Sequence, residues 1–241
     1  MRNWKTKTGC EIIQVLSGRS NAYLILKSGK VILVDTGTKA SFVKLSKNIN
    51  SLKITFEEIS LLILTHTHFD HCQSTKAIKE KSNCKVIASK MASDSIINGY
   101  GQLPNGTFLF TKLIAKLGHL IGKRKFGFEP FQQDIFVIDE YDLNIADSRI
   151  KVIGTPGHSN DSVSILIDNE IAIVGDTMFG IFKNSIFPPY ADDTFKMIES
   201  WGNLLNTDCN IFLPGHGNEI NRNLLKKEYE KNARKHIKRY S

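Results

Sequence analysis

The sequence has few cysteines, no long apolar run and no apolar segment of signal-peptide length near its N-terminus. Four cysteines occur among 241 residues, and no two of them form a CxxC pair. This pattern argues against a disulfide framework and against a structural zinc knuckle. No stretch of about 18 apolar residues is present, so we expect no transmembrane helix. We therefore expect a cytoplasmic protein with free thiols at Cys10, Cys72, Cys84 and Cys209.

The charge balance is basic, with a formal net charge of +8. Much of the excess lies in two stretches, Lys112 to Lys125 and Lys226 to Arg239. Two interpretations stay open: solvated faces of surface helices, which we favour, and contact with nucleic acid or an anionic substrate. Hydrophobic residues make up 41% and charged residues 23%, which allows a sizeable core in one domain of this length.

Hydrophobic periodicity predicts an α/β protein in which strands and helices alternate at first and a run of strands follows. Two turns read as hairpin connections, Ser28-Gly29 and Asp168-Asn169. Helices are predicted over 38–50, 73–81, 192–206 and 221–239, with a short helical turn near 56–60. Strands are predicted over 11–16, on both sides of Ser28-Gly29, and over 60–65, 84–89, 134–139, 149–155, 162–168, 170–176 and around 210–214.

Residues 91–133 interrupt this rhythm. They are rich in glycine and contain an apolar stretch with helical spacing, Thr107 to Ile121. Because they are too few for a core of their own, we predict one domain over residues 1–241 with 91–133 as an insertion. The insertion has three open roles: a lid over a site, a contact with a membrane surface, or ordinary packing. Its apolar side chains are Phe108, Phe110, Leu113, Ile114, Leu117, Leu120 and Ile121.

Histidines are concentrated where predicted strands end. Five of the seven histidines directly follow a strand, and three of these lie within HTHFDH, residues 66–71. In an extended segment, residues i and i+2 point to the same side, so His66 and His68 converge on one point. If the chain turns after His68, Asp70 and His71 face a second point beside it. Imidazole and carboxylate are typical zinc ligands, so this segment predicts a metal site.

Three later segments have the same construction. TPGHS places His158 after a predicted strand, GDT places Asp176 after another, and PGHG places His216 after a third. Neighbouring glycines leave room where backbone approaches a shared centre. Residues in loops at strand ends, held by a rigid scaffold, commonly form functional sites.

The motifs HTHFDH, TPGHS, GDTMF and PGHG, together with VDTG at residues 34–37, resemble those of the metallo-β-lactamase superfamily, near its glyoxalase II and lactonase members. The resemblance implies a four-layer αββα sandwich. It also implies that His66, His68 and His158 hold a first metal ion, that Asp70, His71 and His216 hold a second, and that Asp176 bridges both. Asp35 would orient the HTHFDH loop without touching metal.

The implied chemistry is hydrolysis. Two divalent ions lower the pKa of a shared water, and the resulting hydroxide attacks an ester, lactone or thioester. Asp70 is the candidate catalytic residue, because its carboxyl group can also handle a proton for the leaving group. Zinc is the first choice of metal, and iron and manganese accept the same ligands. The expected partner is a small-molecule substrate, either hydrophobic or bearing an acyl group.

Three other functions stay open. A phosphodiesterase or nuclease similar to ribonuclease Z is favoured by the basic charge, although Phe69 stands where that family prefers a small residue. An oxygenase with one iron uses a similar scaffold. A non-catalytic ligand-binding protein is the last alternative, and the filled set of ligand positions weighs against it.

Several polar or reactive residues are predicted to lie outside the ligand set. His119 belongs to the insertion and His236 to the basic C-terminal helix, and we predict that neither binds metal. Cys72 follows His71 and is predicted to be a buried, inert thiol. Phe179 stands where lactonases of this superfamily carry a tyrosine, and Tyr190 is the alternative source of that phenol.

Overall fold

The strands form two sheets, as seen in a computed structural model that describes residues 1–240, without the side chains of Ile121, Asn144 and residues 235–240. The seven-stranded sheet keeps chain order: β1 (Asn3–Lys5), β2 (Glu11–Leu16), β3 (Ala22–Lys27), β4 (Lys30–Val34), β5 (Ile59–Ile63), β6 (Lys85–Ser89) and β7 (Ile135–Val137). The six-stranded sheet has the order β13 (Ile220–Asn221), β12 (Ile211–Pro214), β11 (Ile171–Gly175), β10 (Val163–Ile167), β9 (Ser148–Gly154) and β8 (Glu140–Ile145).

Both sheets are mixed. Strands β1 to β4 pair antiparallel, whereas β4, β5, β6 and β7 run parallel. In the second sheet β10 is antiparallel to both β9 and β11, and β11 is parallel to β12. Strands β9, β11 and β12 therefore point the same way, and their C-terminal ends lie at one edge of the sheet. Three of the predicted site loops begin at that edge.

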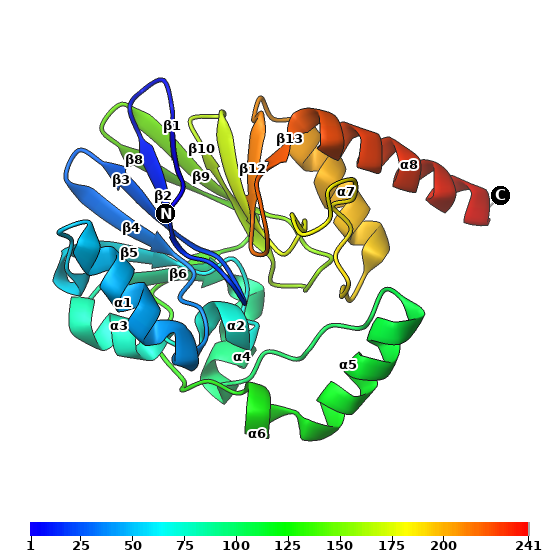
Figure 1. The fold of residues 1–241 in the computed structure, drawn as a ribbon, viewed down its shortest axis with the longest axis horizontal. Helices are drawn as coiled ribbons and strands as arrows, with labels where there is room; N and C mark the ends of the chain where they lie inside the picture. Colours follow the sequence, from blue (N-terminus) through cyan, green and yellow to red (C-terminus); the bar gives the residue numbers. More distant parts are fainter. Residues whose placement is uncertain (241) are drawn as a thin grey trace.

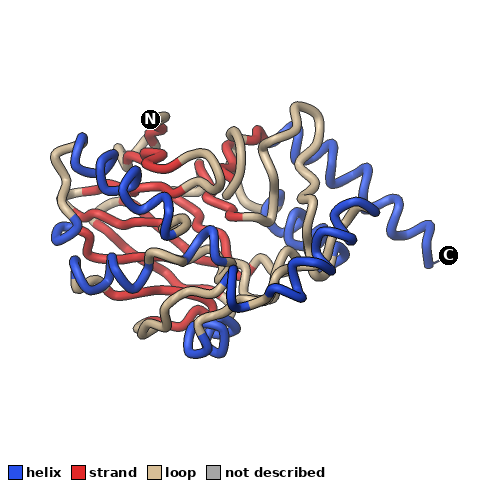
Figure 2. The backbone as a smooth tube through the Cα atoms, turned by 60° about the horizontal axis from the view of Figure 1, so that its bottom comes forward, coloured by secondary structure: helices blue, strands red, loops and turns tan. Residues whose placement is uncertain are grey.

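Helices cover the outer face of each sheet (Figures 1 and 2). On the first sheet lie α1 (Phe42–Ser51), α3 (Thr75–Ser82) and the short α4 (Ser93–Asn98), whose apolar side chains join one core. The second sheet is covered by α7 (Thr194–Leu205) and α8 (Arg222–Tyr240), with Trp201 fully buried in a second core. A third core fills the space between the sheets. These layers confirm the αββα sandwich.

Local chemistry explains the two hairpins. Ser28 and Gly29 have φ values of 49° and 74°, and Asp168 and Asn169 have 54° and 55°. Two consecutive residues with positive φ are the mark of the turn whose twist matches paired strands. Small and Asx residues tolerate this conformation, which confirms both predicted turns.

The predicted helices are present with shifted ends. The helix expected over 73–81 is α3, which begins at Thr75; a short helix that was not predicted, α2 (Phe69–Cys72), precedes it, with Gln73 and Ser74 between them. The helix expected from residue 192 begins at Thr194, because Asp193 caps it by accepting hydrogen bonds from the backbone of Phe195 and Lys196. Three short strands were not predicted: β1, β8 and β13. The turn near residue 56 is a 3-10 helix, Phe56–Glu58, after which β5 begins.

Residues 91–133 lie between β6 and β7 and contain α4, α5 (Leu109–Ile121) and α6 (Lys123–Phe126). In Figure 1 helices α5 and α6 form a green arm set apart from the two sheets. The arm is tied to the second half of the chain, since Thr107 donates its backbone N–H to Pro189 and Ala191 donates to Asn105. All four cysteines are free, as predicted, and all four are buried, which was predicted only for Cys72. Among the described residues no helix combines the length and apolarity needed to cross a bilayer.

Candidate metal centre

The seven predicted ligands come together from four segments. His66 and His68 follow β5 in extended conformation, and the chain then turns into α2, which carries Asp70 and His71. The remaining three follow the ends of β9, β11 and β12: they are His158, Asp176 and His216. Their ligand atoms form three overlapping groups in which every atom lies within 4.8 Å of the others in its group. The geometry therefore agrees with the prediction, while the role of each residue as a ligand stays a prediction.

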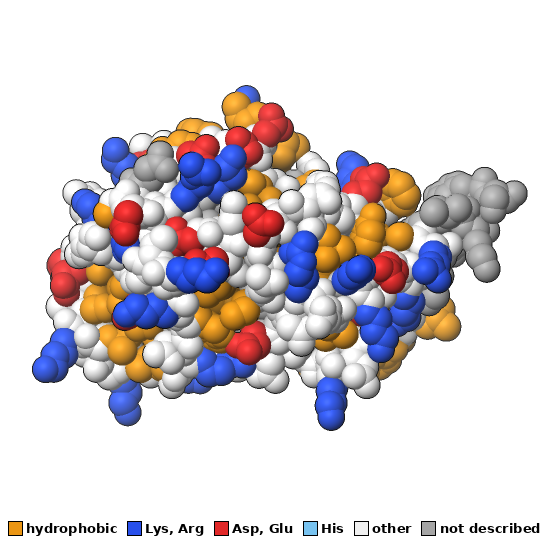
Figure 3. Space-filling model, turned by 90° about the horizontal axis from the view of Figure 1, so that it is seen from above, with side chains coloured by type: hydrophobic (Ala, Val, Ile, Leu, Met, Phe, Trp, Pro, Cys, Tyr) orange, Lys and Arg blue, Asp and Glu red, His pale blue; other side chains and the backbone are white. Residues whose placement is uncertain are grey.

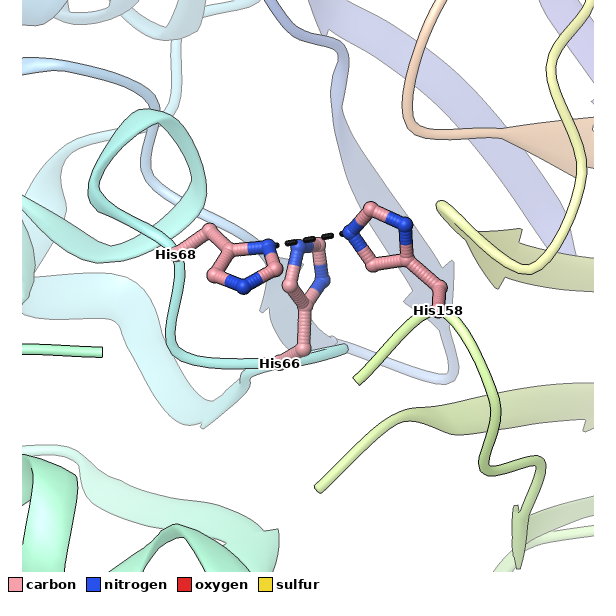
Figure 4. A group of neighbouring side chains, drawn as sticks. All are labelled: His66, His68 and His158. Carbon is pink, nitrogen blue, oxygen red and sulfur yellow. Dashed lines mark hydrogen bonds between the residues drawn. The ribbon is translucent and has the colours of Figure 1, made fainter. Parts of the chain in front are cut away.

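The first group is a triad of imidazoles (Figure 4). His66, His68 and His158 turn their rings toward one another, and Nε2 of His158 lies 2.9 Å from Nδ1 of His68. The rings of His66 and His68 meet edge to face, with their centroids 4.6 Å apart. All three side chains are buried. Neutral imidazoles packed this closely present several nitrogen lone pairs to one point, which suits a cation.

The second group lies beside the first. His71 Nε2 is 3.4 Å from His216 Nε2, which is itself 3.7 Å from a carboxylate oxygen of Asp70. Asp176 stands between the groups: its Oδ1 is 3.3 Å from His71, and its Oδ2 is 3.5 Å from His158 and 3.1 Å from His216. One carboxylate thus faces imidazoles of both groups, the position that a bridging ligand occupies.

Two buried polar atoms show that the centre fits a cation. Among the described residues, only His66 Nε2 and Asp176 Oδ1 are buried side-chain nitrogen or oxygen atoms that lack a hydrogen-bond partner. An unmatched buried polar atom costs about 1–3 kcal/mol, so native proteins rarely keep one without a purpose. Both atoms belong to the predicted ligand set. A donor set of imidazoles and carboxylates is the set that zinc and similar divalent ions take.

The ring nitrogens that point away from the centre are held by other groups. His71 Nδ1 lies 2.8 Å from Asp35, which also accepts hydrogen bonds from the backbone and hydroxyl of Thr65. The backbone carbonyl of Tyr190 lies 2.9 Å from His158 Nδ1, and that of Gln102 lies 3.0 Å from His68 Nε2. Such contacts fix the tautomer and leave the inner nitrogen free to bind. Asp35 has the place predicted for it, behind a ligand.

Electrostatics set three of the ligands, but not His71, in the forms that bind metal; a metal ion would have to displace the proton that the raised pKa of His71 favours. Burial lowers the pKa of His158 to about 3, and burial together with neighbouring histidines holds the pKa of His66 well below its ordinary value. Burial alone would raise the pKa of Asp176, but His216 and His71 hold it well below the ordinary value. Although burial opposes the charge on His71, Asp176 and Asp35 raise its pKa well above 6.5. Neutral imidazole and ionised carboxylate are the states that coordinate metal.

Gly215 is a point where backbone lies directly against ligand side chains. A Cβ atom at this position would lie 2.2 Å from Asp176 Oδ1 and 2.7 Å from His71 Cε1. The backbone cannot retreat easily, because Gly215 donates to Gly175 and accepts from Asn21, both at 2.7 Å.

We therefore expect Gly215→Ala to displace ligand side chains without removing any of them. The bound metal should fall by more than half, measured by elemental analysis of the purified protein, while the far-ultraviolet circular dichroism stays unchanged. Gly154→Ala is the matched control, because the nearest atom to its added methyl would be 3.5 Å away. Full metal content in Gly215→Ala would show that the centre tolerates displacement of these side chains.

A cavity of about 290 Å³ opens over the centre. His68, Asp70, His158, Asp176 and His216 form its floor. Most of its walls are apolar, and many come from residues 91–133: the lining includes Phe69, Leu103, Pro104, Ile114, Ala115, Gly118, Phe126, Phe179 and Tyr190, with Arg19 as the added cation. The ring of Phe179 stacks on His216 with centroids 4.6 Å apart.

His119 and Cys72, which were predicted not to bind metal, lie outside the ligand groups. His119 faces the backbone carbonyl of Leu103 at 2.8 Å, and burial raises the pKa of the Cys72 thiol well above 9.0. The side chain of His236 lies outside the described part of the structure. Sequence reasoning missed Asp161, which accepts hydrogen bonds from the backbone and hydroxyl of Thr67 between two ligands. It also missed Arg19, because a lone exposed arginine gives no pattern in a sequence.

Comparison with known proteins agrees with this geometry. The model of the metallo-β-lactamase superfamily matches residues 17–216. A probable metallo-hydrolase of Methanocaldococcus jannaschii is 30% identical over 82% of this chain and 87% of its own length. An atrochrysone carboxyl ACP thioesterase of Aspergillus fumigatus is 24% identical over 86% of this chain and 56% of its own length.

Solved structures show the same fold. A metallo-β-lactamase of Cronobacter sakazakii superposes with a TM-score of 0.73 at 18% identity, covering 100% of this chain and 94% of its own. The family match spans β3 to β12, which belong to both sheets, and all four loops that carry the histidine and aspartate groups. This chain therefore belongs to the metallo-β-lactamase superfamily.

Proposed function

We propose that the protein is a dinuclear metal-dependent hydrolase that cleaves an ester, lactone or thioester with an apolar acyl group. The observation that carries this proposal is the convergence of five imidazoles and two carboxylates beneath a largely apolar cavity. Zinc is the proposed metal, because nitrogen and carboxylate donors suit it. The proposal includes one domain over 1–241 in which the insertion 91–133 supplies a wall of the substrate cavity.

The ligands divide as the superfamily resemblance implies. His66, His68 and His158 would hold one ion, and Asp176 would reach both. The other ion would be held by Asp70, His71 and His216. When bound, the two ions supply Lewis-acid chemistry, lowering the pKa of a water and polarising the attacked carbonyl. The chain's own residues keep the ligand atoms fixed and shield the reacting carbonyl from bulk water with the cavity walls.

Asp70 has a second role in this proposal. Its side chain is 14% exposed and lines the cavity, so one carboxylate oxygen can face both the second ion and the leaving group. Arg19 Nε lies 3.9 Å from Asp70 Oδ2, at the rim of the cavity. From this position Asp70 would accept a proton released by the attacking water and pass it to the leaving oxygen or sulfur.

Asp70→Asn separates the two roles, because asparagine keeps an oxygen ligand but accepts no proton. We expect kcat to fall roughly 100-fold, the usual worth of a placed acid–base group, while bound metal falls by less than half. Parallel measurement of turnover and metal content checks this. Equal losses in both quantities would leave Asp70 as a ligand only.

The walls of the cavity favour an acyl substrate. Apart from the metal-binding floor, Arg19 is the one charged residue that the structure describes in the cavity lining, whereas a nuclease site needs several phosphate contacts. On the face in Figure 3, lysine and arginine side chains are scattered among acidic and uncharged ones. The thioesterase relative supports the thioester option within this class.

Ile114 sits where the insertion meets the cavity, so its size should set the acyl length that fits. We expect Ile114→Trp to lower kcat/KM for an octanoyl thioester roughly tenfold relative to the acetyl thioester. The larger ring would fill part of the cavity, so the long acyl chain would lose apolar contacts that the acetyl group never makes. Leu117→Trp is the control, because Leu117 lies about one helical turn further along α5, is 55% exposed and does not line the cavity. An unchanged octanoyl-to-acetyl ratio in Ile114→Trp would remove the insertion from substrate binding.

The test of the proposal combines metal analysis with a substrate panel of carboxylic esters, lactones, thioesters and phosphodiesters. We expect two divalent ions per chain and hydrolysis of the carbonyl substrates. Cleavage of phosphodiesters with RNA binding that weakens steeply with salt would replace this function with a nuclease. One iron per chain with oxygen consumption would replace it with an oxygenase.

A further inference from the structure

The outward side of helix α5 is an apolar surface that no other part of the described chain covers. We call this surface the α5 face and define it by Leu109, Phe110, Leu113, Leu117 and Leu120. Leu109 is 89% exposed, Leu120 is 80% and Phe110 is 73%. Helical spacing places most of them on one side. Large apolar side chains gathered on one helix face mark a place where something docks.

The segment of the chain that carries the α5 face has charge of one sign. Residues 95–128 contain no aspartate or glutamate. They contain five cations, which are Lys112, Lys116, Lys123, Arg124 and Lys125, and all five are exposed. The net charge of the whole chain is +8, so this segment of 34 residues carries +5 of it. The α5 face is therefore apolar in its centre and cationic at its borders.

We infer that the α5 face seats the protein on an anionic lipid bilayer. A helix with exposed leucine and phenylalanine on one side and lysine beside them binds at the boundary between headgroups and acyl chains. Lysine and arginine add attraction to anionic headgroups. Other occupants fit less well. A second copy of the chain would bring five cations against five, and a nucleic acid would bury no leucine side chains.

The position of α5 gives this docking a consequence for the active site. Ile114, Ala115 and Gly118 on the same helix line the cavity over the metal centre. Only the thickness of helix α5 therefore lies between the proposed bilayer surface and the cavity. An acyl chain in the bilayer would have a short path to the centre, a step that rests on the proposed function. The docking itself does not depend on catalysis.

The test is co-sedimentation of the full-length protein with lipid vesicles, which needs no substrate. We expect binding to phosphatidylcholine vesicles that contain phosphatidylglycerol to be at least tenfold tighter than to phosphatidylcholine alone. Leu113→Ser with Leu117→Ser should weaken binding to the anionic vesicles at least tenfold. Lys112→Gln with Lys116→Gln should weaken it roughly tenfold.

Helix α1 provides the matched control, because it also carries an exposed apolar residue and an exposed lysine, Val43 and Lys47. Val43→Ser with Lys47→Gln should leave binding unchanged. Leu113→Met with Leu117→Met keeps the α5 face apolar and should retain binding, which separates docking from a folding defect. Three results would overturn the inference: equal affinity for both vesicle types, no binding to either, or a dimer in sedimentation velocity that the serine variant dissolves.

Discussion

Replacing Asp176 with asparagine is expected to lower kcat/KM roughly 1,000-fold or more, the largest single effect predicted for this protein. Within the described part of the chain, Asp176 is the only carboxylate in contact with imidazoles of both groups, at 3.1–3.5 Å from His71, His158 and His216. Asparagine preserves its shape but removes its charge. Lewis-acid catalysis is worth several kcal/mol, and about 1.4 kcal/mol corresponds to a tenfold change in rate. Metal analysis should show at least one ion lost.

Asp192→Asn is the control for this prediction. Asp192 is also a carboxylate close to the site, and desolvation raises its pKa, yet it is exposed and its side chain accepts a hydrogen bond from the backbone of Asn105 and not from an imidazole of either group. The substitution should leave both turnover and metal content within about twofold of the parent protein. An Asp176→Asn variant that keeps two ions and most of its turnover would contradict the bridging role.

Removing the metal is expected to lower the melting temperature by roughly 10 °C. An ion that binds the folded chain at about 1,000 times its Kd adds about 4 kcal/mol to the free energy of unfolding. Without it, His66 Nε2 and Asp176 Oδ1 are left buried and without partners. Calorimetry before and after treatment with a chelator, followed by readdition of zinc, measures the effect.

The variant Asp176→Asn serves as the control for metal removal, because it should lose less stability on chelation. The metal-free chain should keep its helix and strand content, since three separate apolar cores hold the layers. A melting temperature that does not change, with the metal shown to be gone, would mean that the centre is formed by the fold alone.

Much of the fold follows from local patterns in the sequence. Strands β10 and β11 consist of buried residues throughout and read as continuous apolar runs. Their hairpin turn is an Asp-Asn pair that tolerates positive φ. Strands β8 and β13 escaped prediction because EYDLNI has many polar residues and Ile220–Asn221 is only two residues long. Edge strands like these depend on pairing with a neighbour.

In the site, too, local sequence patterns predicted some residues, whereas residues that act through long-range contacts were missed. The ligands were readable because three imidazoles and a carboxylate lie within six residues, and the later ligands follow strand ends. Asp161 could not be identified from the sequence, because its contact with Thr67 joins residues 94 positions apart. The carbonyl groups of Gln102 and Tyr190 that hold the histidine rings were equally hidden, because every residue has a carbonyl and only the fold selects one.

Anomalous X-ray diffraction from crystals grown with zinc, recorded on both sides of the zinc absorption edge, tests the central claim most directly. The account predicts two peaks per chain. One should lie among His66, His68 and His158 and the other among Asp70, His71 and His216, with Asp176 touching both. A single peak, or no peak within coordination distance of these side chains, would contradict the dinuclear centre.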